Sequence, residues 1–399
     1  MKSQNDPYTL VYYVAFAFIT IGQAFNYSLF VIFHQLSFFV KMMAATFSLM
    51  AFVMCLQRFK SRDFVWILLS FLLVAVVGYT SKNYQILYFS YVIILGAKGV
   101  PFRNIVKLHF VLMLIICISN IFGNEMGMVS EQNFSVQDME RENMFGETVE
   151  RENFGYLWAT DFATHVFFIL LDYWILKDAK LSLSVIAIYS FVSFFLFYYC
   201  DARLVVFCIL LILLSSLFIY YKRKRGKALG VVMKYCLKIS IPTFAVLSLV
   251  ITLSFDEFNL YWQATDLFLS GRLGLAQDAI LEYGIPLFGQ SVIFYGHGNA
   301  GYGATSYNYV DSSYIQYMII WGSLLTCLLL FMYYQISRRA LVRKDLTLSF
   351  AVALAGITGI ITQFLFYFGY CIMLVAFLAS HLEYNDKGEI TKASQNVER

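Results

Sequence analysis

The chain has 399 residues, of which 60% are hydrophobic and only 14% are charged, and its formal net charge is +4. Soluble domains average roughly 45–50% apolar and about 25% charged residues, so this composition excludes an ordinary soluble globular protein. The excess of positively charged residues lies in short clusters that are typical of membrane topology signals, which argues against nucleic-acid binding. The sequence therefore predicts a single polytopic membrane domain over residues 1–399.

Apolar segments of the length needed to cross a bilayer, roughly 17–25 residues, recur along the chain. The expected spans are 9–31, 36–56, 64–80, 103–123, 158–176, 181–199, 203–221, 235–254 and 313–335. Segment 84–97 is short for a span, and block 346–382 is long enough to predict two short spans or a helical hairpin. The first segment is too long for a signal-peptide core and is interpreted as a retained span. The predicted fold is an all-α transmembrane bundle of about twelve spans.

Lysines and arginines in short connections stay on the cytoplasmic side, and here they follow every second span. Both termini, including the tail 383–399, are therefore expected in the cytoplasm, and the connection at 200–203 is expected outside. The clusters are Arg58, Lys60 and Arg62; Lys98, Arg103 and Lys107; Lys177 and Lys180; Lys222, Arg223, Lys224, Arg225 and Lys227; and Arg338, Arg339, Arg343 and Lys344.

Two of the outer connections are long. Segment 124–157 is acidic and repeats Glu-Arg-Glu-Asn at 140–143 and 150–153, as a duplicated solvated loop would. In the large external loop 255–312, apolar residues at helical spacing predict a helix from 255 to 268 that lies in the membrane interface. A second helix-like run covers 273–283. The Gly- and Tyr-rich remainder has the composition of sugar sites and of ordinary loops.

Arg151, Arg203 and Arg272 are all expected at the outer surface. A guanidinium group stays charged and matches two phosphate oxygens at once, so these arginines are candidate contacts to a lipid-linked diphosphate. Asp201 offers Arg203 an alternative role in a surface ion pair. Ser270 precedes Arg272 at an expected helix start, where backbone N–H groups bind anions; a solvated loop charge is the alternative.

Lys41 lies in the outer part of the second span, from which its side chain can extend outward to a phosphate. Attack by a sugar hydroxyl needs a base. One candidate is Asp311 at the outer end of the tenth span, which could equally be a helix N-cap. The other is His297 in a glycine-rich loop. Asp161 and Asp172 lie on the sixth span, where either could simply pair with a polar neighbour.

The seven cysteines lie in or at the ends of apolar segments, without a Cys-x-x-Cys pair or a histidine at metal-ligand spacing. We therefore expect neither disulfides nor zinc. The chain also lacks Asp-x-Asp, and no outer carboxylate cluster resembles a divalent-metal site. No metal and no cofactor are expected.

Four short segments resemble motifs of the bacterial O-antigen and capsule repeat-unit polymerases (Wzy type), which are related to the O-antigen ligases. The order of the segments and their shared outer face carry the resemblance, which covers most of the chain in topology. Ala202 and Ser312 depart from the serine and asparagine usual in the family. The segments are 151–156, 201–204, 269–272, and 287–289 followed by 310–314 and Gly322.

This resemblance implies a GT-C-like, metal-independent glycosyltransferase at the outer face of the bacterial cytoplasmic membrane. It would transfer a growing glycan from undecaprenyl diphosphate to a hydroxyl on the next lipid-linked repeat. Arg203 and Arg272 would hold the donor diphosphate, Arg151 would orient the acceptor, and Asp311 or His297 would accept the proton. The implied partners are undecaprenyl-diphosphate-linked oligosaccharides and membrane lipids, with a chain-length regulator protein as a further candidate.

Three other interpretations stay open. A ligase that transfers finished glycan would share almost all of these features. A lipid-linked sugar flippase or solute transporter would place its charges along a path through the membrane centre, whereas the three arginines gather at one side. A non-catalytic scaffold predicts that removing Arg203 or Arg272 leaves polymer length unchanged.

Overall fold

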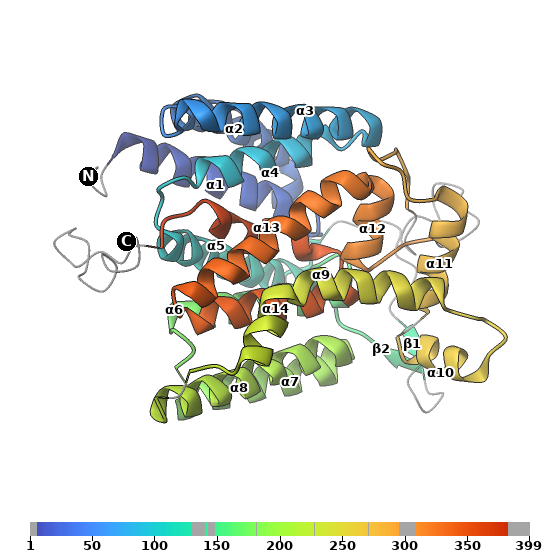
Figure 1. Ribbon diagram of the computed structural model, residues 1–399. Helices are drawn as coiled ribbons and strands as arrows, with labels where there is room; N and C mark the ends of the chain where they lie inside the picture. Colours follow the sequence, from blue (N-terminus) through green and yellow to red (C-terminus); the bar gives the residue numbers. More distant parts are fainter. Residues whose placement is uncertain are drawn as a thin grey trace.

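The computed structural model describes residues 6–129, 140–142, 148–180, 182–226, 228–269, 271–294 and 308–381. Its helices run side by side as a bundle, which lies horizontally in Figure 1. Within the described residues, the only named strands are β1 (Glu140–Glu142) and β2 (Thr148–Glu150), which form a short antiparallel pair. The predicted all-α fold is confirmed, and it is consistent with a helical membrane bundle.

Eight of the described helices are long and apolar enough to cross a membrane. Their spacing matches eight of the predicted spans to within a few residues, because the hydrophobic run needed for a span also fixes where a helix can lie. They are α1 (Pro7–Phe25), α2 (Val31–Leu56), α3 (Phe64–Ser81, preceded by the 3-10 turn η1 at Ser61–Asp63), α5 (Phe102–Glu125), α6 (Ala159–Leu176), α7 (Leu183–Cys200), α8 (Arg203–Lys224) and α9 (Val231–Leu253).

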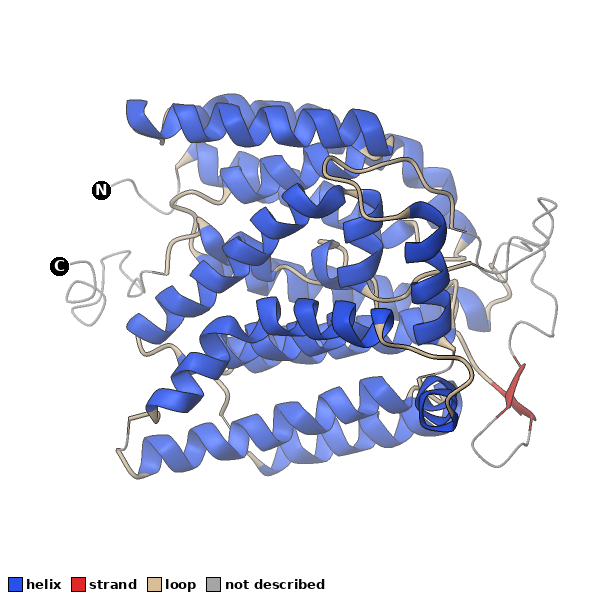
Figure 2. Ribbon diagram, turned by 45° about the vertical axis from the view of Figure 1, so that its right-hand side comes forward, coloured by secondary structure: helices blue, strands red, loops and turns tan. Residues whose placement is uncertain are grey.

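Three other helices belong to the bundle: α4 (Tyr84–Gly96), α13 (Gly322–Val342) and α14 (Leu346–Ile361). The short helix α12 (Ser313–Ile320) precedes α13. The two helices expected in the large loop are present as α10 (Leu260–Phe268) and α11 (Arg272–Tyr283). Both lie at the right-hand end of the bundle in Figures 1 and 2, where α11 runs crosswise to the long helices. We call this the loop-bearing end.

Helix α6 is central, whereas α3 and α7 are peripheral. In its most apolar stretch α6 has 72% of its residues buried, compared with 22% for the η1–α3 segment and 28% for α7. The peripheral helices instead expose large apolar side chains such as Trp66 and Phe191. This pattern is the reverse of a soluble bundle and fits helices whose outer faces meet lipid.

Basic side chains mark the end of the bundle opposite the loop-bearing end. Arg58, just after α2, forms an ion pair with Asp6 at the start of α1. Arg223, near the end of α8, pairs with Asp178 at 2.9 Å, beyond the end of α6. Arg339 donates to a backbone carbonyl in the last described segment of the chain. Three of the predicted basic connections therefore share this end, which we call the basic end.

The predicted pair of spans or helical hairpin at 346–382 is wrong in its second half. Only α14 is an α-helix there; residues 362–381 form an irregular segment with two 3-10 turns, η4 (Phe364–Phe366) and η5 (Met373–Phe377). Most of its residues are buried in the bundle. The segment runs from the end of α14 back to Ser380, which pairs with Pro101 near the basic end. Non-helical backbone at this depth is tolerated only when protein surrounds it.

Polar side chains from neighbouring helices satisfy the backbone of this irregular segment. The hydroxyl of Tyr333 donates to the carbonyl of Leu365 at 2.8 Å. A nitrogen of His109 on α5 lies 3.0 Å from the carbonyl oxygen of Phe368. Without such partners each buried carbonyl would cost about 1–3 kcal/mol. Residues that look out of place in apolar spans thus let the chain cross the bundle without a helix.

The predicted span 313–335 is also interrupted, because α12 and α13 meet at a break. Gly322 has φ +79°, in the left-handed region that favours glycine. A Cβ atom at Gly322 would lie 2.6 Å from the carbonyl oxygen of Leu287. The amide of Ser323 donates to the carbonyl of Pro286 at 2.9 Å. The part of the large loop around Pro286 and Leu287 therefore docks into this break and fixes the position of α12.

Candidate functional site

Arg272 and Asp311 meet at the loop-bearing end, although 38 residues separate them in the sequence. The guanidinium Nε of Arg272 donates to Oδ2 of Asp311 at 2.6 Å. The two side chains retain 20% and 26% of their exposure, so the pair is accessible from outside. Ser312, not Asp311, is the N-cap residue of α12, and no side chain caps that helix end. The N-cap interpretation of Asp311 is therefore wrong.

The backbone amides in the first turn of α11 bind the side chain of Asp266. Oδ1 of Asp266 accepts hydrogen bonds from the backbone amides of Leu273 at 2.7 Å and Gly274 at 3.3 Å. These first-turn amides are the groups that an anion would otherwise use. Any phosphate at Arg272 must therefore bind the guanidinium itself. Ser270, predicted to assist there, lies outside the described residues.

Asp201 and Arg203 form the ion pair that the sequence left as an alternative. Nε and Nη2 of Arg203 donate to the two carboxylate oxygens of Asp201 at 2.8 and 2.9 Å. Asp201 takes a left-handed conformation, with φ +44°, where it ends α7. Two parallel hydrogen bonds hold the guanidinium firmly. Among the described residues, Nη1 of Arg203 has no hydrogen-bond partner and is left for a further anion.

Arg151 lies beside this pair. Its Nε donates to the carbonyl of Cys200 at 2.8 Å, and the amide of Glu152 donates to the carbonyl of Tyr199 at 2.8 Å. The last carbonyls of a helix lack intrahelical partners, so the segment at 151–152 satisfies the end of α7. Arg151 and the Asp201–Arg203 pair thereby occupy the same corner of the loop-bearing end.

Asp161 is a buried acid at the same end of the bundle as the arginines. It lies in the first turn of α6, where it is 4% exposed and accepts a hydrogen bond from the backbone amide of Trp158. Its electrostatic interactions reach both Asp311 and Arg151. Among the described residues, Oδ2 of Asp161 has no hydrogen-bond partner. The sequence showed this acid on a span but gave no sign that it is buried near Arg151 and Asp311.

Tyr309 completes the cluster. Its hydroxyl donates to Oε1 of Gln363 in the irregular segment. Burial raises the pKa of Tyr309 well above its usual value, and the nearby Tyr367, Asp161 and Asp311 act in the same direction. The hydroxyl is therefore protonated at physiological pH and serves as a donor. We define Arg151, Asp161, Arg272, Tyr309 and Asp311 as the outer polar cluster.

Tyrosines lie around the inner side of this cluster. Tyr27, between α1 and α2, packs edge-on against Tyr367 and Tyr370, with ring centroids 5.8 and 5.5 Å apart. Tyr370 also lies 5.2 Å from the ring of His165 on α6. Among the described residues, the Tyr370 hydroxyl and Nδ1 of His165 are buried without hydrogen-bond partners. Amphipathic rings with unused polar atoms suit a ligand that offers both hydroxyls and apolar faces.

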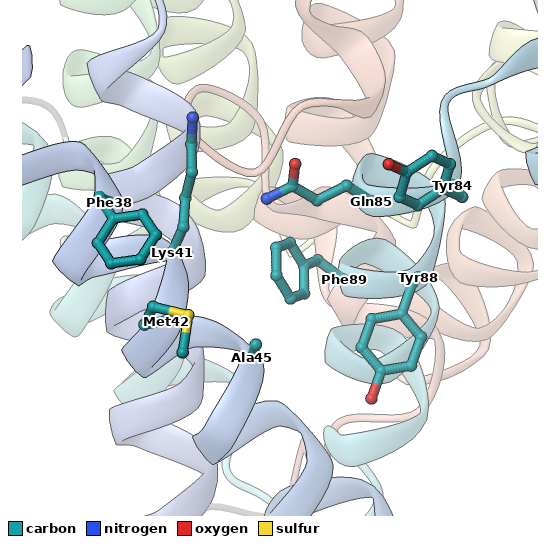
Figure 3. Close-up of a pocket in the computed structure, with 8 residues that line it drawn as sticks. All are labelled: Phe38, Lys41, Met42, Ala45, Tyr84, Gln85, Tyr88 and Phe89. Carbon is teal, nitrogen blue, oxygen red and sulfur yellow. The ribbon is translucent and has the colours of Figure 1, made fainter.

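The remaining predicted site residues lie elsewhere. Lys41 lines a groove between α2 and α4, shown in Figure 3, and none of its described contacts joins it to the arginines. His297 falls outside the described residues. In the part of the chain that the structure describes, no group of three or more His, Cys, Asp or Glu side chains is placed to hold a metal ion.

Comparison of this chain with protein-family models, with curated proteins and with solved structures gives no match. Three features of the chain itself bear on its function: the four sequence motifs, the outer polar cluster and the apolar bundle that carries it.

Proposed function

We propose that this chain is a membrane glycosyltransferase that joins undecaprenyl-diphosphate-linked oligosaccharide repeats into O-antigen or capsular polysaccharide. One observation carries the proposal: Arg272 of one motif forms an ion pair with Asp311 of another, although they lie far apart in the sequence. Arg151, from a third motif, lies at the same end of the bundle. The Asp201–Arg203 motif adjoins them through the contact of Arg151 with Cys200.

The bundle supports a definite topology for this enzyme. On this proposal the chain crosses the membrane twelve times: eleven helical crossings, with α4 and α14 as short ones and α12 and α13 counted together, are followed by a return through 362–381. The positive-inside rule then assigns the basic end to the cytoplasm and the loop-bearing end to the outside. On this proposal both termini are cytoplasmic in a bacterial inner membrane. The outer polar cluster faces the leaflet into which lipid-linked repeats are delivered.

The chemistry needs cations where the leaving diphosphate gains charge and an acceptor for one proton. The acceptor hydroxyl oxygen attacks the anomeric carbon of the donor glycan, and the bond from that carbon to the phosphate oxygen breaks. The electron pair stays on the diphosphate, next to the guanidinium groups of Arg203 and Arg272. Preorganised donors of this kind typically lower a barrier by about 3–4 kcal/mol each.

Asp311 is placed to take the proton. Arg272 holds its Oδ2, whereas Oδ1 has no hydrogen-bond partner among the described residues. The hydroxyl proton passes to that oxygen as the new glycosidic bond forms. Arg151 assists in orienting the acceptor, and both lipid anchors keep the reactants at one depth, which supplies much of the rate. His297 stays the alternative base.

The test is gel analysis of surface polysaccharide in a strain that lacks this protein and is complemented with variants at matched expression. We expect Arg272→Gln and Arg203→Gln to lower chain elongation at least about 100-fold, so that single-repeat product accumulates. Arg223→Gln is the matched control, because it breaks an Arg–Asp pair at the basic end.

Normal long chains from both outer variants would refute the proposal. Long chains that stay unattached would instead identify a ligase.

A transporter is the second candidate, because His109 and Asp172 form a buried pair deep in the bundle, as in proton relays. The other nitrogen of His109 supports the irregular segment through the carbonyl of Phe368, which gives the pair a structural role. Uptake of a lipid-linked sugar into vesicles that depends on the proton gradient, without glycan elongation, would favour transport.

A further inference from the structure

A groove of about 410 Å³ lies between α2 and α4. Figure 3 shows its walls: Phe38, Met42 and Ala45 on α2 face Tyr88 and Phe89 on α4. Its volume is within the range of about 300–1,000 Å³ that is typical of small-molecule sites. The side chain of Phe38 is 76% exposed and that of Met42 is 53% exposed, so the groove opens on the outer face of the bundle, where lipid is expected.

The groove has a polar end and an apolar end. Lys41 and Gln85 extend from opposite walls at the upper end in Figure 3, while Ala45 and Tyr88 lie below them. Lys41 belongs to the first half of α2 and Gln85 to the first turn of α4. Both helices begin at the loop-bearing end, because the residues that follow them, Arg58 and Lys98, contact each other at the basic end. The polar end of the groove therefore points toward the headgroup region on that side.

Lys41 carries a charge that no residue in the described part of the chain balances. It is the single charged residue among those lining the groove, and no described carboxylate forms an ion pair with it. A lone ammonium on a lipid-facing helix is costly unless it reaches water or an anion. An anionic lipid headgroup would supply such an anion, and Gln85 offers an amide donor on the opposite wall.

We propose that this groove binds one anionic phospholipid with a single phosphate, independently of the glycan chemistry proposed above. The phosphate lies between Lys41 and Gln85, and one acyl chain runs down the apolar walls past Met42 and Ala45. A single cation in the groove matches one phosphodiester charge. A diphosphate carries more charge and calls for several cations, as the arginines at the loop-bearing end supply. The groove is therefore separate from the site of the lipid-linked donor.

The groove also adjoins the connection that holds α12. At the outer end of α3, next to α4, the hydroxyl of Thr80 donates to the carbonyl of Phe288 at 2.6 Å. That carbonyl belongs to the loop docked at Gly322, just beyond α12. A lipid that holds α4 against α2 therefore also stabilises the connection between α3 and α4, which contacts this loop through Thr80. Bound lipid is expected to raise the thermal stability of the purified protein.

The test uses the full chain, purified and delipidated in a neutral detergent, with lipid counted by native mass spectrometry. Phosphatidylglycerol, phosphatidylcholine and undecaprenyl diphosphate are each titrated. We expect one phosphatidylglycerol per chain to bind at least about tenfold more tightly than phosphatidylcholine. Lys41→Gln and Ala45→Phe are each expected to lose that preference at least tenfold, while Lys41→Arg keeps it.

Matched controls are Lys107→Gln on α5 and Ala187→Phe on α7, both exposed residues outside this groove. Equal phosphatidylglycerol binding by wild type, Lys41→Gln and Ala45→Phe overturns the proposal, as does equal retention of phosphatidylcholine. Preferential binding of undecaprenyl diphosphate in the groove also overturns it and assigns the groove to the carrier. If Ala45→Phe fails to fold, Lys41→Gln decides alone, because it removes charge from an exposed position without filling space.

Discussion

Replacing His109 with leucine removes the side chain that joins α5, α6 and the irregular segment. His109 is fully buried and Asp172 is 2% exposed. One ring nitrogen faces the Asp172 carboxylate and the other lies 3.0 Å from the carbonyl of Phe368. Because a carbonyl can only accept, Nε2 is the donor to Phe368, and Nδ1 is the atom that pairs with Asp172. His109→Leu leaves both partners unsatisfied inside the bundle.

The loss in the free energy of unfolding follows from the two groups that the change leaves without a partner, the Phe368 carbonyl and the Asp172 carboxyl group. An unpaired buried carbonyl costs about 1–3 kcal/mol, and a buried acid that loses its partner about 3–5 kcal/mol, so we expect His109→Leu to destabilise the fold by about 4–8 kcal/mol. The double variant His109→Leu with Asp172→Leu leaves only the Phe368 carbonyl without a partner. Its free energy of unfolding should therefore fall by about 1–3 kcal/mol. The second substitution therefore restores stability to the first.

Reversible unfolding in a denaturing-detergent series, followed by circular dichroism, measures these free energies. His34→Leu is the control, because His34 is exposed on α2. The explanation is refuted if His109→Leu unfolds like wild type, or if the double variant is no more stable than the single one. Either result would mean that the His109–Asp172 pair does not hold the irregular segment in place. A role of this pair in proton transfer would then be the better explanation.

Two further predictions concern other parts of the molecule. Asp161→Asn should lower glycan elongation in the complemented strain at least about tenfold without lowering thermal stability, because the unpaired oxygen contributes little to the fold. Gly322→Ala should destabilise the protein by more than the roughly 1–2 kcal/mol of backbone strain, because its Cβ meets the docked loop. Gly226→Ala, with φ +60° and open space around it, should show the strain alone in the same melting assay.

The site could be predicted in part. The sequence selected Arg151, Arg203 and Arg272, and the structure places all three at one end of the bundle. It offered the Asp201–Arg203 ion pair as an alternative, but it did not reveal that Arg272 holds the carboxylate of Asp311. Ion pairs such as Arg272–Asp311 join residues far apart in the chain, so their geometry depends on how α11 and α12 pack.

Asp161 was visible in the sequence only as an acid on an apolar span. Its position near Arg151 and Asp311 follows from the approach of α6 to the loop-bearing segments, which no local pattern records. The groove at Lys41 likewise exists because α2 and α4 lie side by side. Residue type suggested what each side chain could bind, and packing decided what it contacts.

The sequence alone determined the class of protein and the positions of its long helices, because a bilayer requires about 20 consecutive apolar residues wherever the chain crosses as a helix. Hydrophobicity is a local property and can be summed along the chain. The tertiary structure decided that residues 362–381 return through the bundle without an α-helix. That segment is as apolar as its neighbours, and only partners such as His109 and Tyr333, brought to it by folding, satisfy its backbone.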